Sequence, residues 1–265
     1  MNGHPTSERT GIIERATYPS DAFAIDVWVM RPVTQGRFPV ILYNHGSKKR
    51  ADGYIDSGCP TLSFDTPVWA GVSAGLCAVV FPEGRGYGAS TGPGLEACHD
   101  MADVWSFLKG RGRDAAACAA WLTNLAWADT SRLIVCGCSH GGIVSLLAQA
   151  DLNVCGSVLQ APATGDQAPE ASMPDLIDAL KRSKAPILLQ HAEHDLHAPI
   201  EFSRSLCRLG RDSGKDMRLL EYPFQRSMGG HDQFAWRNRR IWGRDFNRFA
   251  CQSLGVAGDL LGGCQ

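Results

Sequence analysis

The sequence has almost no net charge: 26 lysines and arginines face 27 aspartates and glutamates, leaving a formal net charge of -1 at pH 7. No basic stripe offsets this balance, which argues against a nucleic-acid-binding surface. Long apolar runs are also missing, since the longest have the length of a strand and fall well short of a membrane span. Residues 1–9 lack the apolar core of a signal peptide. We therefore expect a cytoplasmic protein with no nucleic-acid or membrane partner, in which residues 1–19 form a leader and the start of the first strand.

The composition is that of an ordinary globular protein, with 44% hydrophobic and 20% charged residues in a chain of 265. Ten cysteines are many for a chain without a secretion signal. Cys77, Cys136 and Cys155 fall inside apolar runs, where a thiol acts as a small hydrophobic group. We expect buried, reduced thiols. Cys59 and Cys98, both in loop sequence rich in glycine and proline, are the pair to examine for a disulfide.

Eight strand-like runs recur, at residues 12–18, 23–30, 38–43, 76–81, 132–137, 156–160, 186–191 and 217–222. The first two alternate apolar and polar residues, as an antiparallel edge does, and the later ones are continuously apolar, as strands covered on both faces are. Helical stretches are predicted at 97–128, broken near 110–112, and at 141–150, 200–209 and 232–253. This pattern predicts a single α/β domain over 20–255 with a mostly parallel eight-stranded sheet, followed by a tail at 256–265. Ligands of such sheets bind at the carboxyl ends of the strands.

The segment Gly137-Cys138-Ser139-His140-Gly141 lies between a predicted buried strand and a predicted helix. A G-x-S-x-G sequence in that context predicts a nucleophile elbow, a strained turn that exposes the serine. A second match, Gly71-Val72-Ser73-Ala74-Gly75, precedes its strand instead of following it. We therefore reject Ser73 and keep Ser139 as the candidate nucleophile.

A serine hydroxyl needs an adjacent base, and the base needs a third group that orients it. Asp195 follows the strand predicted at 186–191, and His231 follows the last strand, after two glycines. Glu193 is the alternative acid. Ser139, Asp195 and His231 thus come after three different strands, in the order in which an elbow serine, an acid and a histidine occur.

Five motifs together carry a resemblance to a known family: Tyr43-Asn44-His45-Gly46, Glu83-Gly84-Arg85-Gly86-Tyr87-Gly88-Ala89-Ser90, Gly137-Cys138-Ser139-His140-Gly141, His194-Asp195-Leu196-His197-Ala198-Pro199 and Gly230-His231. In this order they resemble the α/β-hydrolase superfamily, in its dienelactone hydrolase-like and prolyl-oligopeptidase-like branches, over residues 20 to 250. The sequence departs from the family pattern at two positions. Ala192 stands where the family often has a glycine before its acid, and Ser139 stands where dienelactone hydrolases proper have a cysteine nucleophile.

The resemblance implies a role for each candidate residue. Ser139 would be the nucleophile, His231 the general base and then acid, and Asp195 the group that orients the imidazole. The oxyanion hole would use the backbone N–H of His140 and that of Ser47, with Gly46 as the alternative. The short connection between the strands near 160 and 186 predicts little or no cap domain and an open cleft.

The resemblance therefore implies a serine hydrolase that cleaves a small-molecule ester with a small or medium acyl group. Thioester or peptide cleavage, and an inactive binding protein on the same fold, stay open, as does a homo-oligomer. We expect no metal, because the spacing of His191, His194 and His197 matches no zinc motif. We expect no cofactor either, because no helix follows directly after the G-x-G-x-x-A sequence at 84–89.

Overall fold

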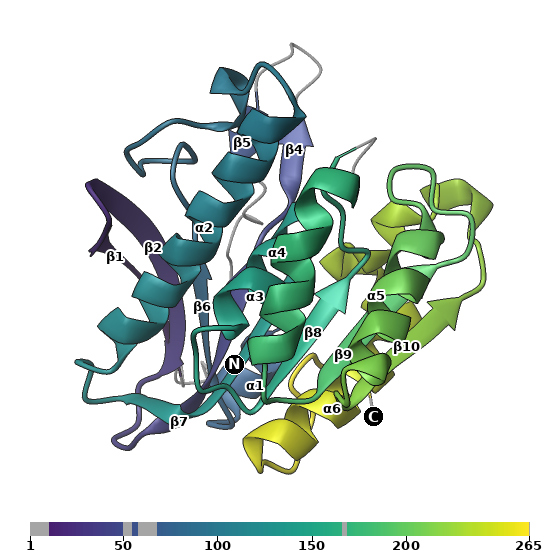
Figure 1. Ribbon diagram of the computed structural model, residues 1–265. Coiled ribbons are helices and arrows are strands. Elements are labelled where there is room, and N and C mark those ends of the chain that lie inside the picture. The colour runs from purple at the N-terminus through teal and green to yellow at the C-terminus, as the bar shows by residue number, and fades with distance from the viewer. Residues whose placement is uncertain (1–10, 50–54, 58–67, 166–168, 265) are drawn as a thin grey trace.

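An eight-stranded sheet runs through the centre of the molecule in the computed structural model, which describes residues 11–49, 55–57, 68–165 and 169–264 (Figure 1). The strand order is β1-β2-β6-β3-β7-β8-β9-β10. The strands are β1 (Gly11–Ser20), β2 (Phe23–Pro32), β3 (Phe38–Asn44), β6 (Ala78–Pro82), β7 (Ala128–Cys138), β8 (Gly156–Gln160), β9 (Ile187–Ala192) and β10 (Met217–Tyr222). All eight predicted strands are confirmed.

The strand directions follow the hydrophobic patterns. β1 pairs with β2, and β2 with β6, in antiparallel fashion, while the remaining neighbours are parallel. In β3 the side chains of Val40 and Leu42 enter one hydrophobic core, and those of Ile41 and Tyr43 enter the other. Because successive side chains of a strand point to opposite faces, a strand covered on both faces is continuously apolar.

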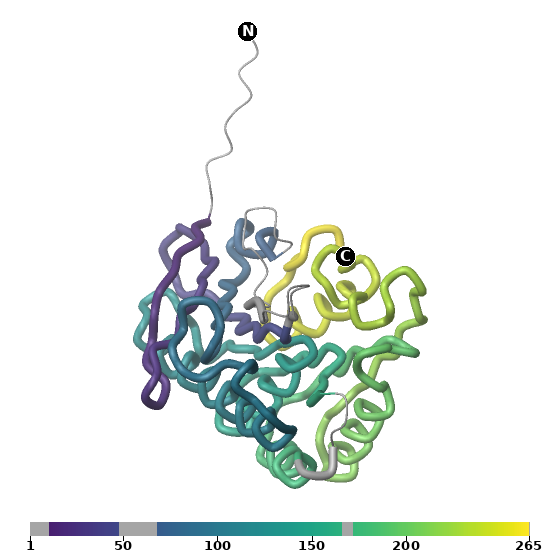
Figure 2. The backbone as a smooth tube through the Cα atoms, turned by 90° about the horizontal axis from the view of Figure 1, so that it is seen from above, coloured from purple at the N-terminus to yellow at the C-terminus, as the bar shows by residue number. Residues whose placement is uncertain are grey.

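Two layers of helices cover the sheet (Figure 1, Figure 2). The helices are α1 (Trp69–Ser73), α2 (Met101–Leu122), α3 (His140–Gln149), α4 (Pro169–Arg182), α5 (Ile200–Asp212) and α6 (Arg239–Leu254). Helices α2 to α5 pack on one face, and α1 and α6 pack on the other. Short 3₁₀ turns are η1 (Leu95–Ala97), η2 (Arg226–Met228), η3 (His231–Phe234) and η4 (Trp236–Asn238).

The predicted break in the long helix near Gly110 and Gly112 is wrong, because α2 is continuous. A Cβ at Gly110 would lie 2.9 Å from Arg85 Nη1, and one at Gly112 would lie 3.0 Å from Leu147 Cβ. A glycine inside a helix costs about 1 kcal/mol relative to alanine. Here the two glycines allow Arg85 and Leu147 to pack close to the helix, and this packing outweighs the low helix propensity of glycine.

The C-terminal region also departs from the predictions. The helix expected from residue 232 begins at Arg239, after the turns η3 and η4. The segment predicted as a tail buries Leu260 and Leu261 completely, against the sheet face that α6 covers. Helix α4 and the two-stranded ribbon of β4 (Ser47–Lys49) and β5 (Ile55–Ser57) were not predicted.

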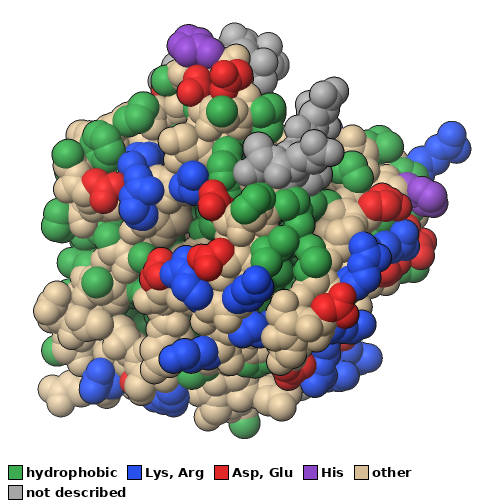
Figure 3. All heavy atoms as spheres, in the orientation of Figure 1, with side chains coloured by type: hydrophobic (Ala, Val, Ile, Leu, Met, Phe, Trp, Pro, Cys, Tyr) green, Lys and Arg blue, Asp and Glu red, His purple; other side chains and the backbone are tan. Residues whose placement is uncertain are grey.

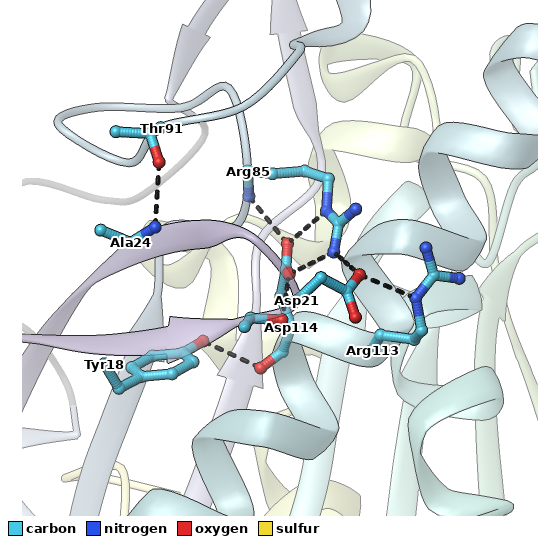
Figure 4. A network of polar contacts seen from close by, with 8 residues as sticks. Tyr18, Asp21, Ala24, Arg85, Thr91, Arg113 and Asp114 are labelled. Atoms are coloured by element: carbon cyan, nitrogen blue, oxygen red, sulfur yellow. Dashed lines mark hydrogen bonds and ion pairs between the residues drawn. The ribbon is translucent and has the colours of Figure 1, made fainter.

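The glycine-rich loop after β6 is tied to the rest of the molecule by Arg85 (Figure 4). Its guanidinium donates to the buried carboxylate of Asp114 on α2, at 2.7 and 3.0 Å, and to Asp21 in the β1–β2 turn, at 2.9 Å. Gly84 and Gly86 have φ of +72°, a conformation that favours glycine. The loop is therefore a structural turn that joins the first hairpin to α2.

The surface shown in Figure 3 mixes both signs of charge, with basic and acidic side chains side by side. Arg182 pairs with Asp151 and Asp178, and Lys109 pairs with Asp175 at 3.1 Å. None of the helices in the described ranges is both long and apolar enough to span a membrane.

The nine cysteines that the structure describes are free thiols, Cys98 among them. Cys59, the other member of the pair named for a disulfide, lies outside the described residues.

Candidate active site

The candidate residues gather at one edge of the sheet. Ser139 follows β7, Asp195 lies in the loop after β9, and His231 lies in the segment after β10. These strands are parallel, and β8 is the only strand between β7 and β9 in the described sheet. The carboxyl ends of parallel strands meet at one edge, so three residues far apart in sequence come together there.

Ser139 has the strained backbone of a nucleophile elbow. Its φ of 57° and ψ of -127° lie outside the regions that L-residues with side chains favour. The turn is fixed by hydrogen bonds: the Ser139 N–H donates to the Gln160 carbonyl at 2.9 Å, and the Ser139 carbonyl accepts from Gly142 at 2.9 Å. Such strain persists only where the surroundings enforce it, and it often marks a functional position.

The two glycines of the motif are required by close packing. A Cβ at Gly137 would lie 2.2 Å from the Gly141 carbonyl oxygen, and one at Gly141 would lie 2.0 Å from the Asn44 carbonyl oxygen. Real Cβ atoms do not approach other atoms so closely. The elbow is therefore pressed against the end of β3, which is possible only without side chains at these two positions.

Asp195 and His231 form a hydrogen bond with 2.8 Å between Oδ2 and Nδ1. The Asp195 side chain is completely buried, and that of His231 is 17% exposed. Burial favours a raised pKa for Asp195, but hydrogen bonds from His191 and His231 outweigh it and hold the pKa well below its usual range. The carboxylate is therefore ionised, Nδ1–H donates to it, and Nε2 of His231 is free to accept a proton.

The loop around Asp195 is shaped to hold this carboxylate. Its Oδ1 accepts from the backbone N–H groups of His197 at 2.8 Å and Ala198 at 3.0 Å. A Cβ at Gly230 would lie 2.7 Å from the Asp195 Cα, so the glycine before His231 permits the close approach of the two loops. Glu193, the alternative acid, is exposed.

His191 lies against the Asp195 carboxylate, a contact that no sequence motif predicted. Its side chain is fully buried, with Nε2 3.5 Å from Asp195 Oδ2 and 2.9 Å from the Ala198 carbonyl. Nδ1 lies 2.7 Å from the Ser203 hydroxyl. With two acceptors at Nε2, that nitrogen carries the proton and Nδ1 accepts from Ser203.

The three histidines considered for a metal site do not converge. His191 faces Ser203 and Ala198, the His194 ring contacts Phe224, and the His197 ring lies 5.6 Å from the His231 ring. Across the described residues, no group of three or more His, Cys, Asp or Glu side chains is arranged to hold a metal ion.

The candidate oxyanion donors flank Ser139. His140 begins α3, and Gly46 lies against the serine, since a Cβ there would be 3.1 Å from Ser139 Cβ. Ser47 follows Gly46 as the first residue of β4. The buried His140 imidazole has no hydrogen-bond partner at Nδ1 among the described residues, and burial, with the charge of Arg111, lowers its pKa to about 4. No hydrogen bond joins His231 to the Ser139 hydroxyl, both residues being described.

Comparisons with known proteins place the fold. No family model and no curated protein matches the sequence. Solved structures do match: Pyrococcus horikoshii acylaminoacyl peptidase has a TM-score of 0.67 at 17% identity over 94% of this chain, which spans 43% of the peptidase. Acetyl Xylan Esterase 1 from Thermoanaerobacterium sp. has a TM-score of 0.69 at 17% identity over 95% of this chain and 86% of the esterase.

A third match is a protein assigned as a dienelactone hydrolase from Klebsiella pneumoniae, with a TM-score of 0.62 at 15% identity over 91% of this chain and 98% of that protein. All three are members of the α/β-hydrolase fold, to which the mostly parallel eight-stranded sheet between layers of helices in this chain corresponds. The chain therefore has the α/β-hydrolase fold, with structural neighbours that are hydrolases.

Proposed function

We propose that the protein is a serine hydrolase that cleaves carboxylic esters with a small or medium acyl group through an acyl-enzyme intermediate. The observation that carries this proposal is the hydrogen bond between Asp195 and His231, beside a strained Ser139 on the same edge of the sheet. An ionised acid that orients an imidazole near a partly buried elbow serine is the arrangement that serine hydrolysis requires.

The reaction would proceed in two steps. Nε2 of His231 accepts the hydroxyl proton as Ser139 attacks the ester carbonyl, and the imidazolium then gives that proton to the leaving alcohol. Water repeats the sequence on the acyl-enzyme and releases the acid. In unliganded enzymes the contact between nucleophile and base is often long and tightens when substrate binds.

The tetrahedral intermediate carries a negative charge on the former carbonyl oxygen. The N–H of His140, at the start of α3, and an N–H of the Gly46–Ser47 turn are the proposed donors to it. Each such donor contributes about 3 kcal/mol to transition-state stabilisation. The start of α3 adds the positive end of a helix dipole.

The connection between β8 and β9 supports an open cleft. Its described part contains α4, a helix of 14 residues that packs against α3 and α5, and no cap domain. The absence of a cap domain from this described connection is the basis for proposing small or medium acyl groups. Peptide cleavage is the alternative, and the match to the acylaminoacyl peptidase favours testing it in parallel.

The test is hydrolysis of p-nitrophenyl esters of increasing chain length by the wild type and two serine variants. Ser139→Ala is expected to lower kcat by at least about 10⁴-fold. Ser73→Ala is the matched control, because Ser73 lies in the other G-x-S-x-G sequence and its hydroxyl donates to the Ala70 carbonyl at 3.1 Å. A chelator is expected to leave activity unchanged.

Retention of activity in Ser139→Ala would refute the assignment, and loss in Ser73→Ala alone would reverse the choice between the two motifs. If the wild type is inert on all esters, assays with N-acyl peptides and a fluorophosphonate probe distinguish a hydrolase with another substrate from a binding protein. Labelling of the wild type but not of Ser139→Ala supports a serine hydrolase with another substrate. No labelling of either supports a binding protein on this fold.

A further inference from the structure

Arg111, on the inner face of α2, is a buried cation that the proposed reaction does not yet use. Its side chain is among the largest fully buried groups of the described structure. Nε and Nη1 are buried without a hydrogen-bond partner, and no ion pair reaches this guanidinium from the described residues. A buried charge without a carboxylate is costly, so its retention calls for another explanation.

The surroundings of Arg111 partly compensate for its charge. The guanidinium carbon lies 5.0 Å from the centre of the Tyr87 ring and 6.0 Å from that of Phe107. Asp114, one helical turn away on α2, is engaged by Arg85 and by the Ser20 hydroxyl. Aromatic faces attract a cation but do not neutralise it. The positive charge of Arg111 is therefore available to the single backbone group that it binds within the described residues.

That group is the carbonyl of His45, directly before the Gly46–Ser47 turn. Nη2 of Arg111 donates to the His45 carbonyl oxygen at 2.9 Å and lies 3.3 Å from His45 Nε2. The imidazole of His45 is wedged between two more carbonyls, with Nε2 2.6 Å from Glu83 O and Nδ1 2.6 Å from Gly46 O. Arg111 and His45 thus hold both peptide groups of the turn that lies against Ser139.

We propose that Arg111, acting through His45, positions and polarises the turn that supplies the second oxyanion donor. This inference rests on the proposed serine-hydrolase function. Arg111 touches neither the substrate nor Ser139 and is therefore a positioning residue.

The physical reason lies in the peptide group. The carbonyl of His45 and the N–H of Gly46 belong to one planar unit and point in opposite directions. A cation that binds the carbonyl makes the N–H a stronger donor, as in any polarised hydrogen-bond chain. The Gly46 carbonyl is linked in the same way to the N–H of Ser47, and it contacts the His45 ring. The arrangement therefore serves whichever of the two amides binds the oxyanion.

The neutral state of the neighbouring histidines agrees with this role. The carbonyls of Glu83 and Gly46 at its two ring nitrogens favour a charged His45 ring, but burial and the Arg111 charge outweigh them and lower its pKa to about 3. Burial and the Arg111 charge also lower the pKa of His140 to about 4. Both rings are therefore uncharged near neutral pH, and the fixed positive charge beside the turn is that of Arg111.

The test compares Arg111→Met, Arg111→Lys and Arg37→Met with the wild type on one p-nitrophenyl ester. Arg37 is a matched control, because its guanidinium also donates to a backbone carbonyl, that of Ala128, at the opposite end of β3. The measurements are kcat, KM, the melting temperature and the inhibition constant of phenylboronic acid. This acid adds to an active serine as a tetrahedral anion and so reports on the oxyanion hole.

Loss of a complete oxyanion donor lowers kcat about 10²–10³-fold. For Arg111→Met, which weakens a donor without removing it, we expect kcat to fall about 10- to 100-fold at a KM within about threefold of wild type. The affinity for phenylboronic acid should fall by the same factor as kcat. Arg111→Lys keeps the charge but not the planar guanidinium, so its kcat and boronate affinity should lie between those of the wild type and of Arg111→Met. Arg37→Met should match the wild type in kcat and in boronate affinity.

A folded Arg111→Met enzyme with wild-type kcat and boronate affinity would overturn the proposal, as would a loss confined to KM or to melting temperature. If Arg111→Met does not fold, Arg111→Lys decides: a loss of about fivefold or more in kcat and boronate affinity supports the role, and unchanged values reject it. Activity that survives Ser139→Ala would refute the proposed function itself. Activity that depends on Ser139 but not on Arg111 would refute the role of Arg111 alone.

Discussion

Acidification should destabilise this protein through two buried histidines, His45 and His140. A histidine in an unfolded chain has a pKa of about 6.5. In the folded protein, burial and the Arg111 charge lower the pKa to about 3 for His45 and about 4 for His140. As the pH falls below about 6.5, the unfolded chain takes up protons that the folded protein cannot bind. Stability is therefore complete above that pH and declines until the pH reaches the folded values.

The magnitude follows from these pKa values. At pH 5 each histidine favours the unfolded state by about 2 kcal/mol, and at pH 7 it does so by only about 0.2 kcal/mol. The two together should lower the free energy of unfolding by about 4 kcal/mol between pH 7 and pH 5. Domains are typically stable by about 5–15 kcal/mol, so the effect takes a large share of the total.

The assay is urea unfolding at pH 7 and pH 5, followed by tryptophan fluorescence. A His140→Gln variant should lose about 2 kcal/mol less than the wild type between the two pH values, because one of the two buried groups no longer titrates. His99 is exposed, so His99→Gln is the control and should behave as the wild type. Equal stability of the wild type at both pH values, or a pH dependence unaltered in His140→Gln, would refute the reasoning.

Two further substitutions test the site. Asp195→Asn should keep the contacts with the His197 and Ala198 amides but lose the charge that orients His231, and kcat on a p-nitrophenyl ester should fall about 10³–10⁴-fold. The melting temperature should fall as well, because the lowered pKa of Asp195 means that its ionised form stabilises the fold. A loss of kcat under tenfold would point to Glu193 as the acid. Gly141→Ala would place a Cβ 2.0 Å from the Asn44 carbonyl oxygen, so we expect it to abolish activity and to lower the soluble yield, and a fully active, stable variant would contradict the close packing described for the elbow.

The fold was largely predictable because its signals are local. The eight strands follow from runs of apolar residues, and the antiparallel edge follows from the alternation in β1 and β2. The grouping of Ser139, Asp195 and His231 could be predicted, because each follows a predicted strand and the carboxyl ends of parallel strands lie at one edge of the sheet. Their hydrogen-bond geometry was not, since it depends on loops that meet only in the folded chain.

The predictions that failed depended on contacts between distant segments. The glycines of α2 read as a break because a glycine disfavours a helix, yet Arg85 and Leu147 pack where the missing side chains would be. Residues 256–265 were predicted as a tail, but Leu260 and Leu261 within this segment are buried in the core beside α1. In both cases tertiary packing overrode the local preference.

Spacing and local hydrophobicity were enough to predict the strand pattern, the elbow around Ser139 and the three candidate catalytic residues, because these features depend on residues close together in the chain. The contacts that support the site, by contrast, arise only when distant segments fold together. His191 lies beneath Asp195, and Arg111 reaches the His45 carbonyl across 66 residues of sequence. Neither contact has a signature in sequence, because a buried charge or imidazole gains its role from the groups that folding brings around it.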